Sequence, residues 1–309
     1  MQRLSKYRVP SGGFLNRMVM GLILVLIVVS LPAIYSLSRG RIQAFHEAQQ
    51  SSRSTAQILG QSVTNTLEKV DYALQVTVEE VLCHQQRGGD TQELLQFIER
   101  QYRRLPELDS LMITDARGMV LLGSGHQLPG PVSLADREYF TYLRDHTGVG
   151  LVLSKPIISK ISGKRGISCA RRITLPDGSF GGVAFGVLPL QQFQELFSKA
   201  TLGKNGSVAL RFADMELIIR HTAQENAEVS PGRAEKKISA AWQQKLEQGE
   251  TTEGSYLTES VSDGVRRSFS YIRLSPYPLY LNVGLAVDDY LKFWRKDLLL
   301  TLLDRKSVV

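Results

Sequence analysis

The feature that most constrains this chain is an uncharged run near its N-terminus. Residues 18–37 read MVMGLILVLIVVSLPAIYSL, which is twenty residues without a charge. At 1.5 Å per residue, such a helix is long enough to cross a bilayer core of about 30 Å. Four basic residues and no acidic residue precede the run, whereas only Arg39 and Arg41 flank it on the other side. The asymmetry predicts a transmembrane helix at 18–37 with residues 1–17 in the cytoplasm. The alternative, a cleaved signal peptide, usually has a shorter apolar run and a small-residue cleavage site.

The net charge of +7 is distributed unevenly. Residues 1–17 carry four positive charges and residues 292–309 carry a net three, so residues 39–291 are neutral. Basic residues at membrane flanks orient spans and meet anionic lipid. A nucleic-acid-binding domain needs a surplus of positive charge on its folded part, and we therefore expect no nucleic-acid partner.

A long helix is expected directly after the predicted span. Apolar residues recur at helical spacing between residues 59 and 81, and no proline interrupts residues 38–86 before Gly88 and Gly89. The stripe consists of Leu59, Val63, Leu67, Val70, Leu74, Val78 and Val81. This pattern indicates one face of an α-helix. We interpret residues 38–86 as a stalk, with an ordinary core helix as the alternative.

The following residues change to the pattern of an α+β fold. After a short helix predicted at 91–104, two apolar runs surround a turn at 115–118, and a second hairpin turns at 176–178. Between the hairpins, Ser133 and Asp136 form an S-x-x-D start signal for a helix at 134–145.

The strand pattern then repeats. Residues 206–222 resemble the hairpin at 108–125, and residues 266–294 resemble residues 169–197. Phe193 and Phe197 correspond to Tyr290 and Trp294, both at an offset of 97 residues. A period near 100 residues predicts a duplicated lobe rather than a solenoid.

This organisation, with the segments DREYFTYLRDHTGVGLVLSKPI and ARRITLPDGSFGGVAFGVLPLQQF, resembles the double Cache family of extracytoplasmic sensor domains. The resemblance covers about residues 39–293 and is strongest to versions on sensor diguanylate cyclases and sensor histidine kinases. It implies two tandem PAS-like lobes with antiparallel sheets: a membrane-distal lobe at 87–200 and a membrane-proximal lobe at 201–293. It also implies a small ligand in the distal lobe and a parallel homodimer through the long helices.

The C-terminal segment is expected to be the start of a second membrane span. Residues 294–303 read WRKDLLLTLL, with Trp294 as an interfacial aromatic residue. Residues 304–309, DRKSVV, resemble a peptide encoded by a short-read sequencing adaptor. We therefore expect a truncated reading frame without its output domain; the alternative is a natural basic tail.

Sequence motifs for catalysis are missing. The chain has no G-x-S-x-G, no H-E-x-x-H and no cysteine–histidine pattern with metal-ligand spacing. We expect no catalysis, no metal and no cofactor for this chain. Its two cysteines, Cys83 and Cys169, are interpreted as separate thiols, with a single bridge as the alternative.

Ligand binding is better supported than catalysis. Residues 137–172 contain eight basic and two acidic residues within an otherwise neutral domain. Arginine grips carboxylates bidentately, so this cluster predicts an anionic, carboxylate-like ligand. The resemblance to the family motif implies Arg137, Tyr139, Ser154 and Arg171 as ligand-binding residues. Phe140 shares a turn with Arg137 and Tyr139 and could wall an apolar pocket, and His146 could tune binding with pH. The expected geometry brings Arg137 and Arg171 together and turns Arg172 to the opposite face of its strand.

The sequence thus predicts the sensing part of a receptor in the bacterial inner membrane, with its sensor domain in the periplasm. One alternative is that Arg137 is a structural ion-pair partner and that Tyr139 and Phe140 are core residues. The functional alternative is a membrane-anchored interaction module that senses a periplasmic protein without a small ligand. An extracytoplasmic enzyme is a third class, disfavoured by the missing site chemistry.

Overall fold

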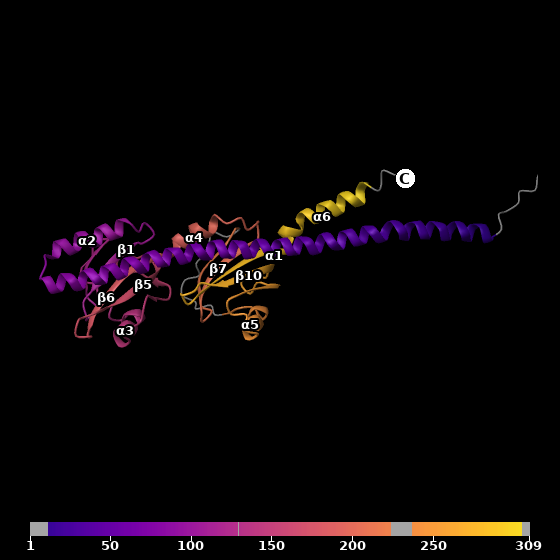
Figure 1. The fold of residues 1–309 in the computed structure, drawn as a ribbon. Helices are drawn as coiled ribbons and strands as arrows, with labels where there is room; N and C mark the ends of the chain where they lie inside the picture. Colours follow the sequence, from indigo (N-terminus) through magenta and orange to yellow (C-terminus); the bar gives the residue numbers. More distant parts are fainter. Residues whose placement is uncertain (1–11, 129, 224–236, 305–309) are drawn as a thin grey trace, which may run out of the picture. The chain divides into compact units, whose positions relative to one another are not determined.

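The computed structural model describes residues 12–128, 130–223 and 237–304 (Figure 1). The chain divides into two compact units. The first comprises residues 1–48 and 288–309, and the second comprises residues 49–287. The helix α1 (Gly12–Arg87) begins in the first unit and continues through the second.

The first unit pairs the beginning of α1 with α6 (Val287–Asp304). The Phe45 ring meets the edge of Tyr290 at a centroid distance of 6.5 Å. Gly40 leaves room for the indole of Trp294, since a Cβ at Gly40 would lie 3.2 Å from Trp294 Cδ1. The segment predicted at 294–303 is therefore helical and, at Trp294, packs on α1.

None of the helices, over the residues that the structure describes, is both long and apolar enough to cross a membrane. The span predicted at 18–37 includes side chains outside those described, and it stays a prediction. Of the predicted adaptor-derived segment, residues 305–309 also lie outside the described residues.

In the second unit, α1 is the helix predicted from the apolar stripe. Leu67, Val70 and Leu74 are completely buried, and Val78 is half-buried. The helix ends where a glycine takes a conformation that other residues rarely adopt: Gly88 has φ +63°. The next amide, of Gly89, donates a hydrogen bond to the His84 carbonyl. The predicted end of the helix is therefore confirmed.

The first lobe is built on an antiparallel sheet with the strand order β2-β1-β6-β5-β3, and β4 also pairs with β5. Both predicted hairpins are present as β1–β2 and β5–β6. The elements are α2 (Thr91–Arg103), β1 (Ser110–Thr114), β2 (Val120–Ser124), α3 (Glu138–Asp145), β3 (Val152–Leu153), β4 (Ile157–Ile158), β5 (Arg165–Thr174) and β6 (Phe180–Pro189).

The second lobe repeats this topology, with the strand order β8-β7-β11-β10-β9. Each sheet thus has a hairpin at one edge, and the later hairpin of the lobe pairs with it through β6 or β11. The elements are α4 (Leu190–Ser198), β7 (Ser207–Phe212), β8 (Leu217–Thr222), α5 (Ala240–Glu247), β9 (Glu253–Glu259), β10 (Arg266–Arg273) and β11 (Leu279–Ala286). The α+β class and the duplication are confirmed.

One predicted helix start is wrong. The helix expected at 134–145 begins only at Glu138, and Arg137 is its N-cap residue without a side-chain cap. Ser133 instead forms a β-bridge with Met119, and its hydroxyl accepts from the amide of Ala135. The S-x-x-D pattern therefore marks a turn that leads from the hairpin to α3.

The helices cover the two faces of each sheet differently. One apolar cluster joins α1, α2 and α4 to one face of both sheets. On the opposite face, α3 packs on the first sheet and α5 on the second (Figure 1). Cys169 is buried and Cys83 is exposed; both thiols are free, as predicted.

Candidate ligand-binding site

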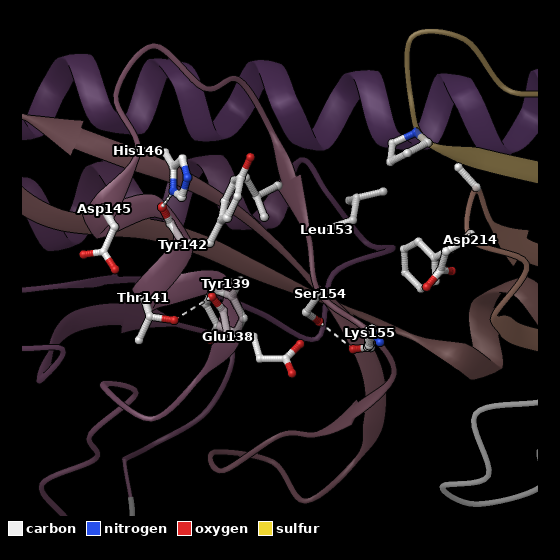
Figure 2. Close-up of a pocket in the computed structure, with 14 residues that line it drawn as sticks. Glu138, Tyr139, Thr141, Tyr142, Asp145, His146, Leu153, Ser154, Lys155 and Asp214 are labelled. Atoms are coloured by element: carbon white, nitrogen blue, oxygen red, sulfur yellow. Dashed lines mark hydrogen bonds between the residues drawn. The ribbon is translucent and has the colours of Figure 1, made fainter.

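A pocket of about 650 Å³ opens beside α3. This volume lies in the range of small-molecule sites. Its walls come from α3, from β3 with the two residues that follow it, and from two turns of the second lobe (Figure 2). The lining residues are Glu138, Tyr139, Thr141, Tyr142, Asp145, His146, Val152, Leu153, Ser154, Lys155, Phe212, Ala213, Asp214 and Pro278.

Helical spacing explains which side chains α3 contributes. Tyr139 and Tyr142 are three residues apart and therefore lie on one side of the helix. Tyr139 is buried, and burial raises the pKa of its phenol to about 12, with Ser168 and Arg137 acting in the opposite direction. Tyr142 is 45% exposed and stacks on His146 at a centroid distance of 4.3 Å. The ring of Tyr139 thus forms a buried wall of the pocket, and the ring of Tyr142 forms an accessible one.

The strand side of the pocket is held by Ser154. Its hydroxyl accepts from the Ser168 amide at 2.8 Å and donates to the Lys155 carbonyl at 2.7 Å. These bonds fix the backbone where Lys155 leaves the sheet. The Lys155 ammonium lies 2.8 Å from a carboxylate oxygen of Glu216, and this hydrogen bond raises the lysine pKa.

The second lobe contributes the turn between β7 and β8. The Ala213 amide donates to the Pro278 carbonyl at 2.8 Å, which joins this turn to the one before β11. Phe212 and Pro278 provide apolar walls, and Asp214 adds a carboxylate.

The sequence predicted a site rich in basic residues, but most of the charged residues that line the pocket are acidic. Three carboxylates line it, from Glu138, Asp145 and Asp214, against one lysine, Lys155. Asp145 is bonded by Arg144, which lowers the pKa of this carboxyl. Within the described residues, the Glu138 carboxylate has no hydrogen bond and no ion pair in direct contact, but its charge helps to raise the pKa of Lys155. The lining therefore offers a free acidic group and an ammonium group.

The structure brings three of the predicted site residues together. Tyr139, His146 and Ser154 all line the pocket. His146 Nδ1 lies 2.9 Å from the Tyr142 carbonyl, so a hydrogen bond there orients the ring. Whether these residues bind a ligand stays a prediction.

The other three predicted residues lie elsewhere. Arg137 donates from Nη2 to the Ile158 carbonyl at 2.9 Å. Phe140 is 1% exposed and packs its edge on Phe180 at 5.3 Å, as in the core alternative. Arg171 pairs bidentately with Asp71 of α1, at 2.5 and 3.0 Å.

The expected geometry of the two adjacent arginines is wrong. Arg171 faces α1, whereas Arg172 reaches the α3 side and donates to the carbonyls of Leu143 and Arg144 at 2.6 and 2.7 Å. Neighbouring strand residues do point to opposite faces, as assumed. Which of the two faces α3 depends on the register of β5, and that register is set by pairing with β6.

The basic cluster is likewise not one positive surface, because most of its members meet individual acids. The ion pairs join Arg144 to Asp145, Lys155 to Glu216, Lys160 to Asp136, Lys164 to Asp109 and Arg171 to Asp71. Four of these acids lie outside residues 137–172, so a local count of charges in the sequence could not reveal the pairing.

Sequence reasoning missed several lining residues. Tyr142 could have been found, since it lies three residues after Tyr139 on the helix, and Glu138 could have been found, since it lies four residues before Tyr142. Phe212 and Asp214 come from the other lobe, about 70 residues away in the chain, and no local pattern marks them. Among the residues that the structure describes, no cluster of histidine, cysteine or acidic side chains could hold a metal ion.

The duplicated α+β lobes, the long helix and the pocket define a class of protein: a sensor domain that binds small molecules. The sequence profile of the Cache domain family, in its double form, matches residues 43–292. The chain belongs to this family. Its members are extracytoplasmic ligand-binding modules of receptors in signal transduction and do not catalyse reactions themselves.

Solved structures show the same fold. One is the extracellular domain assigned to the histidine kinase rpHK1S-Z16, with 24% identity and a TM-score of 0.66 over 78% of this chain and 95% of that one. Another is the ligand-binding domain of the Pseudomonas fluorescens chemoreceptor CtaA in complex with L-isoleucine, with 15% identity and a TM-score of 0.58 over 82% and 98%.

A third is the ligand-binding domain of the Pseudomonas aeruginosa PAO1 amino acid chemoreceptor PctB with L-Arg, with 14% identity and a TM-score of 0.56 over 76% and 93%. The search of curated proteins returned no significant match.

Proposed function

We propose that this chain is the periplasmic sensing part of a transmembrane receptor and that its pocket binds an amino acid. The observation that carries the proposal is the lining itself. It combines the free carboxylate of Glu138, the ammonium of Lys155 and apolar walls in a pocket of about 650 Å³. An α-amino acid with an apolar side chain carries the complementary groups.

The charges favour this ligand over a simple anion. The ammonium group of an amino acid would meet Glu138, and its carboxylate would meet Lys155 and the hydroxyl of Tyr142. Tyr139, Phe212 and Pro278 would surround an apolar side chain. A ligand with only a carboxylate would leave Glu138 unpaired next to a second negative charge, which costs binding energy. Similar domains bind L-isoleucine and L-Arg, which supports the same ligand class here.

The proposal also places the start of α1 in a membrane. Apolar side chains at the start of α1 are exposed around the helix: Leu22 is 63%, Leu24 64% and Leu26 61% exposed. A bilayer would cover them. We place residues 18–37 in the inner membrane, with a second span from residue 294 leading to a cytoplasmic diguanylate cyclase or histidine kinase.

A parallel homodimer along α1 completes the proposal. Ile58 and Tyr72 are 68% and 70% exposed on this helix, and a second copy would cover such side chains. Ligand binding would then shift a population between two arrangements of the spans rather than drive a reaction.

The test is a thermal-shift screen of the whole chain in detergent with the standard amino acids and simple carboxylates, followed by calorimetry on the hits. Glu138→Gln should weaken amino acid binding about tenfold to a hundredfold, because a charge-assisted hydrogen bond is lost. Asp136→Asn is the matched control. It lies two residues away, outside the pocket, and is bonded by Lys160.

Two results would overturn the proposal. Tighter binding of simple carboxylates by Glu138→Gln than by the unchanged chain would identify an anion site. If no small molecule stabilises the chain, the pocket is not a ligand site, and a sensor for a periplasmic protein would be favoured.

A further inference from the structure

The second lobe has a cavity of about 40 Å³, partly open to solvent, between α5 and its sheet. This cavity shares no lining residue with the pocket beside α3 described above. The cavity is lined by Ser207, Ala209, Arg211, Arg220, Lys237, Ile238, Ser239, Trp242, Tyr256, Thr258, Ser260, Val261, Ser262, Phe269 and Asn282. Its volume holds about three water molecules, or a molecule of a few non-hydrogen atoms.

Two deeply buried side chains of the lining have polar atoms without partners. Trp242 is 1% exposed and its Nε1–H donates to nothing in the described residues; Asn282 is 7% exposed and its Oδ1 accepts nothing there. The amide of Asn282 is oriented because its Nδ2 donates to the Tyr256 hydroxyl at 2.8 Å. Ser239 caps α5 and accepts from the Trp242 amide. Each unpaired buried group costs about 1–3 kcal/mol.

The position of the first lobe that corresponds to Asn282 is apolar. At the offset of 97 residues between the lobes, Asn282 corresponds to Phe185. The registers agree: Phe185 lies between Met112 and Ala170, and Asn282 lies between Ala209 and Tyr271. Phe185 is 1% exposed within an apolar cluster. The same position therefore holds the buried apolar Phe185 in the first lobe and, in the second lobe, Asn282, whose Oδ1 accepts no hydrogen bond from the described residues.

The charged side chains that line the cavity, within the described residues, are basic, and one of them, Arg220, forms an ion pair with Asp263. Arg211, Arg220 and Lys237 line it, and no acidic side chain is among its described lining residues. Arg211 donates to the Met215 carbonyl and Arg220 to Asp263, so both guanidinium groups are held in place. The rings of Tyr271 and Tyr256 lie 5.4 and 6.0 Å from that of Trp242 and exclude bulk water from its indole.

We propose that this cavity is a second ligand site, for a small hydroxycarboxylic acid. The carboxylate would accept from Trp242 Nε1–H on the basic side of the lining, and the hydroxyl would donate to Asn282 Oδ1. A two-carbon hydroxy acid has three oxygen atoms, which take the place of about three waters. This site lies beyond the amino acid site proposed above and does not depend on it.

The experiment is calorimetry of the whole chain in detergent with glycolate as the probe. Acetate, which lacks the hydroxyl donor, should bind at least about tenfold more weakly, because it leaves Asn282 Oδ1 unpaired. In a Trp294→Phe background, Trp242 is the remaining tryptophan, and glycolate should change its fluorescence.

Two variants test the residues. Trp242→Phe removes the N–H donor and keeps an aromatic ring, and Asn282→Leu restores an apolar residue as in the first lobe. Each variant should weaken the binding of glycolate at least about tenfold. Glu138→Gln, in the other pocket, should leave glycolate binding unchanged.

Saturable glycolate binding that both variants weaken at least about tenfold supports the site. No heat and no fluorescence change would mean that the cavity holds only water, and would overturn the proposal. Equal binding by the unchanged chain and by Asn282→Leu would overturn it too, because the ligand would then sit elsewhere. Asn282→Leu keeps the test valid if Trp242→Phe fails to fold.

Discussion

Arg267 is a charged residue that the fold buries almost completely, at 1% exposure. Its guanidinium donates to both carboxylate oxygens of Asp263 at 2.7 and 2.8 Å and to the Asn205 carbonyl at 2.6 Å. Burial alone would raise the pKa of Asp263, but the hydrogen bonds from Arg267 and Arg220 outweigh it and hold the pKa well below its usual range. The folded state therefore stabilises the charged form of the Asp263 carboxylate.

Asp263→Asn should destabilise the protein by about 3 kcal/mol, because it leaves a buried arginine without its counter-charge. Urea unfolding at neutral pH measures the loss. The pH dependence has a defined sign. Since the folded pKa is depressed, the contribution of Asp263 is complete above its unfolded pKa and is lost as the pH falls toward the folded value.

The control is Asp136→Asn, which breaks a pair with Lys160 whose side chains are 64% and 36% exposed. We expect this variant to lose at most about 1 kcal/mol in free energy of unfolding. An equal loss for both variants would contradict the role given to burial.

At the scale of elements, α1 is the helix that both sheets share. Its buried stripe belongs to a cluster that includes residues of both lobes, such as Leu111 and Val283. A helix interior packed on two sheets derives its stability from this burial rather than from intrinsic propensity.

Leu67→Ala should cost about 3 kcal/mol, because Leu67 is completely buried and the cavity left behind cannot fully collapse. The matched variant is Ile58→Ala on the same helix, where the side chain is 68% exposed. In the monomer it should change the free energy of unfolding by less than about 0.5 kcal/mol. A larger loss at protein concentrations where the chain is dimeric would support the proposed homodimer, in which a second copy covers this face.

The elements themselves were predictable because their signals are local. The stripe of α1, its end at Gly88 and the hairpins β1–β2 and β5–β6 each follow from spacing and turn residues within a short window. The start of α3 was not predictable, because Ser133 forms a β-bridge with Met119, the residue directly before β2. A tertiary contact there replaced the capping role that the motif suggested.

The candidate site was only partly predictable for a related reason. Tyr139 and Ser154 were identified from the resemblance to a family and His146 from its ability to titrate, and all three line one pocket. The position of Arg171 depends on a partner 100 residues earlier, Asp71. Contacts of that range arise from the assembled fold, and a single sequence carries no direct signal for them.

At the scale of the whole molecule, the two lobes of residues 49–287 share one apolar cluster along α1. A shared core predicts shared unfolding, whereas two lobes with separate cores would unfold independently. The ion pair between Lys155 of the first lobe and Glu216 of the second adds a polar connection. Receptor function of the proposed kind requires such coupling, since a ligand in one lobe must bias the other.

We therefore expect a fragment of residues 49–287 to fold by itself and to unfold in one transition. Trp242 is its only tryptophan and lies in the second lobe, so its fluorescence reports that lobe, while far-ultraviolet circular dichroism reports the helices and strands of both. The two urea curves should coincide. Leu111→Ala, in the completely buried part of β1 in the first lobe, should lower the midpoint seen by Trp242 by an amount equivalent to about 3 kcal/mol. If Leu111→Ala moves the circular dichroism curve and leaves the Trp242 curve in place, the lobes unfold separately, and α1 does not couple them.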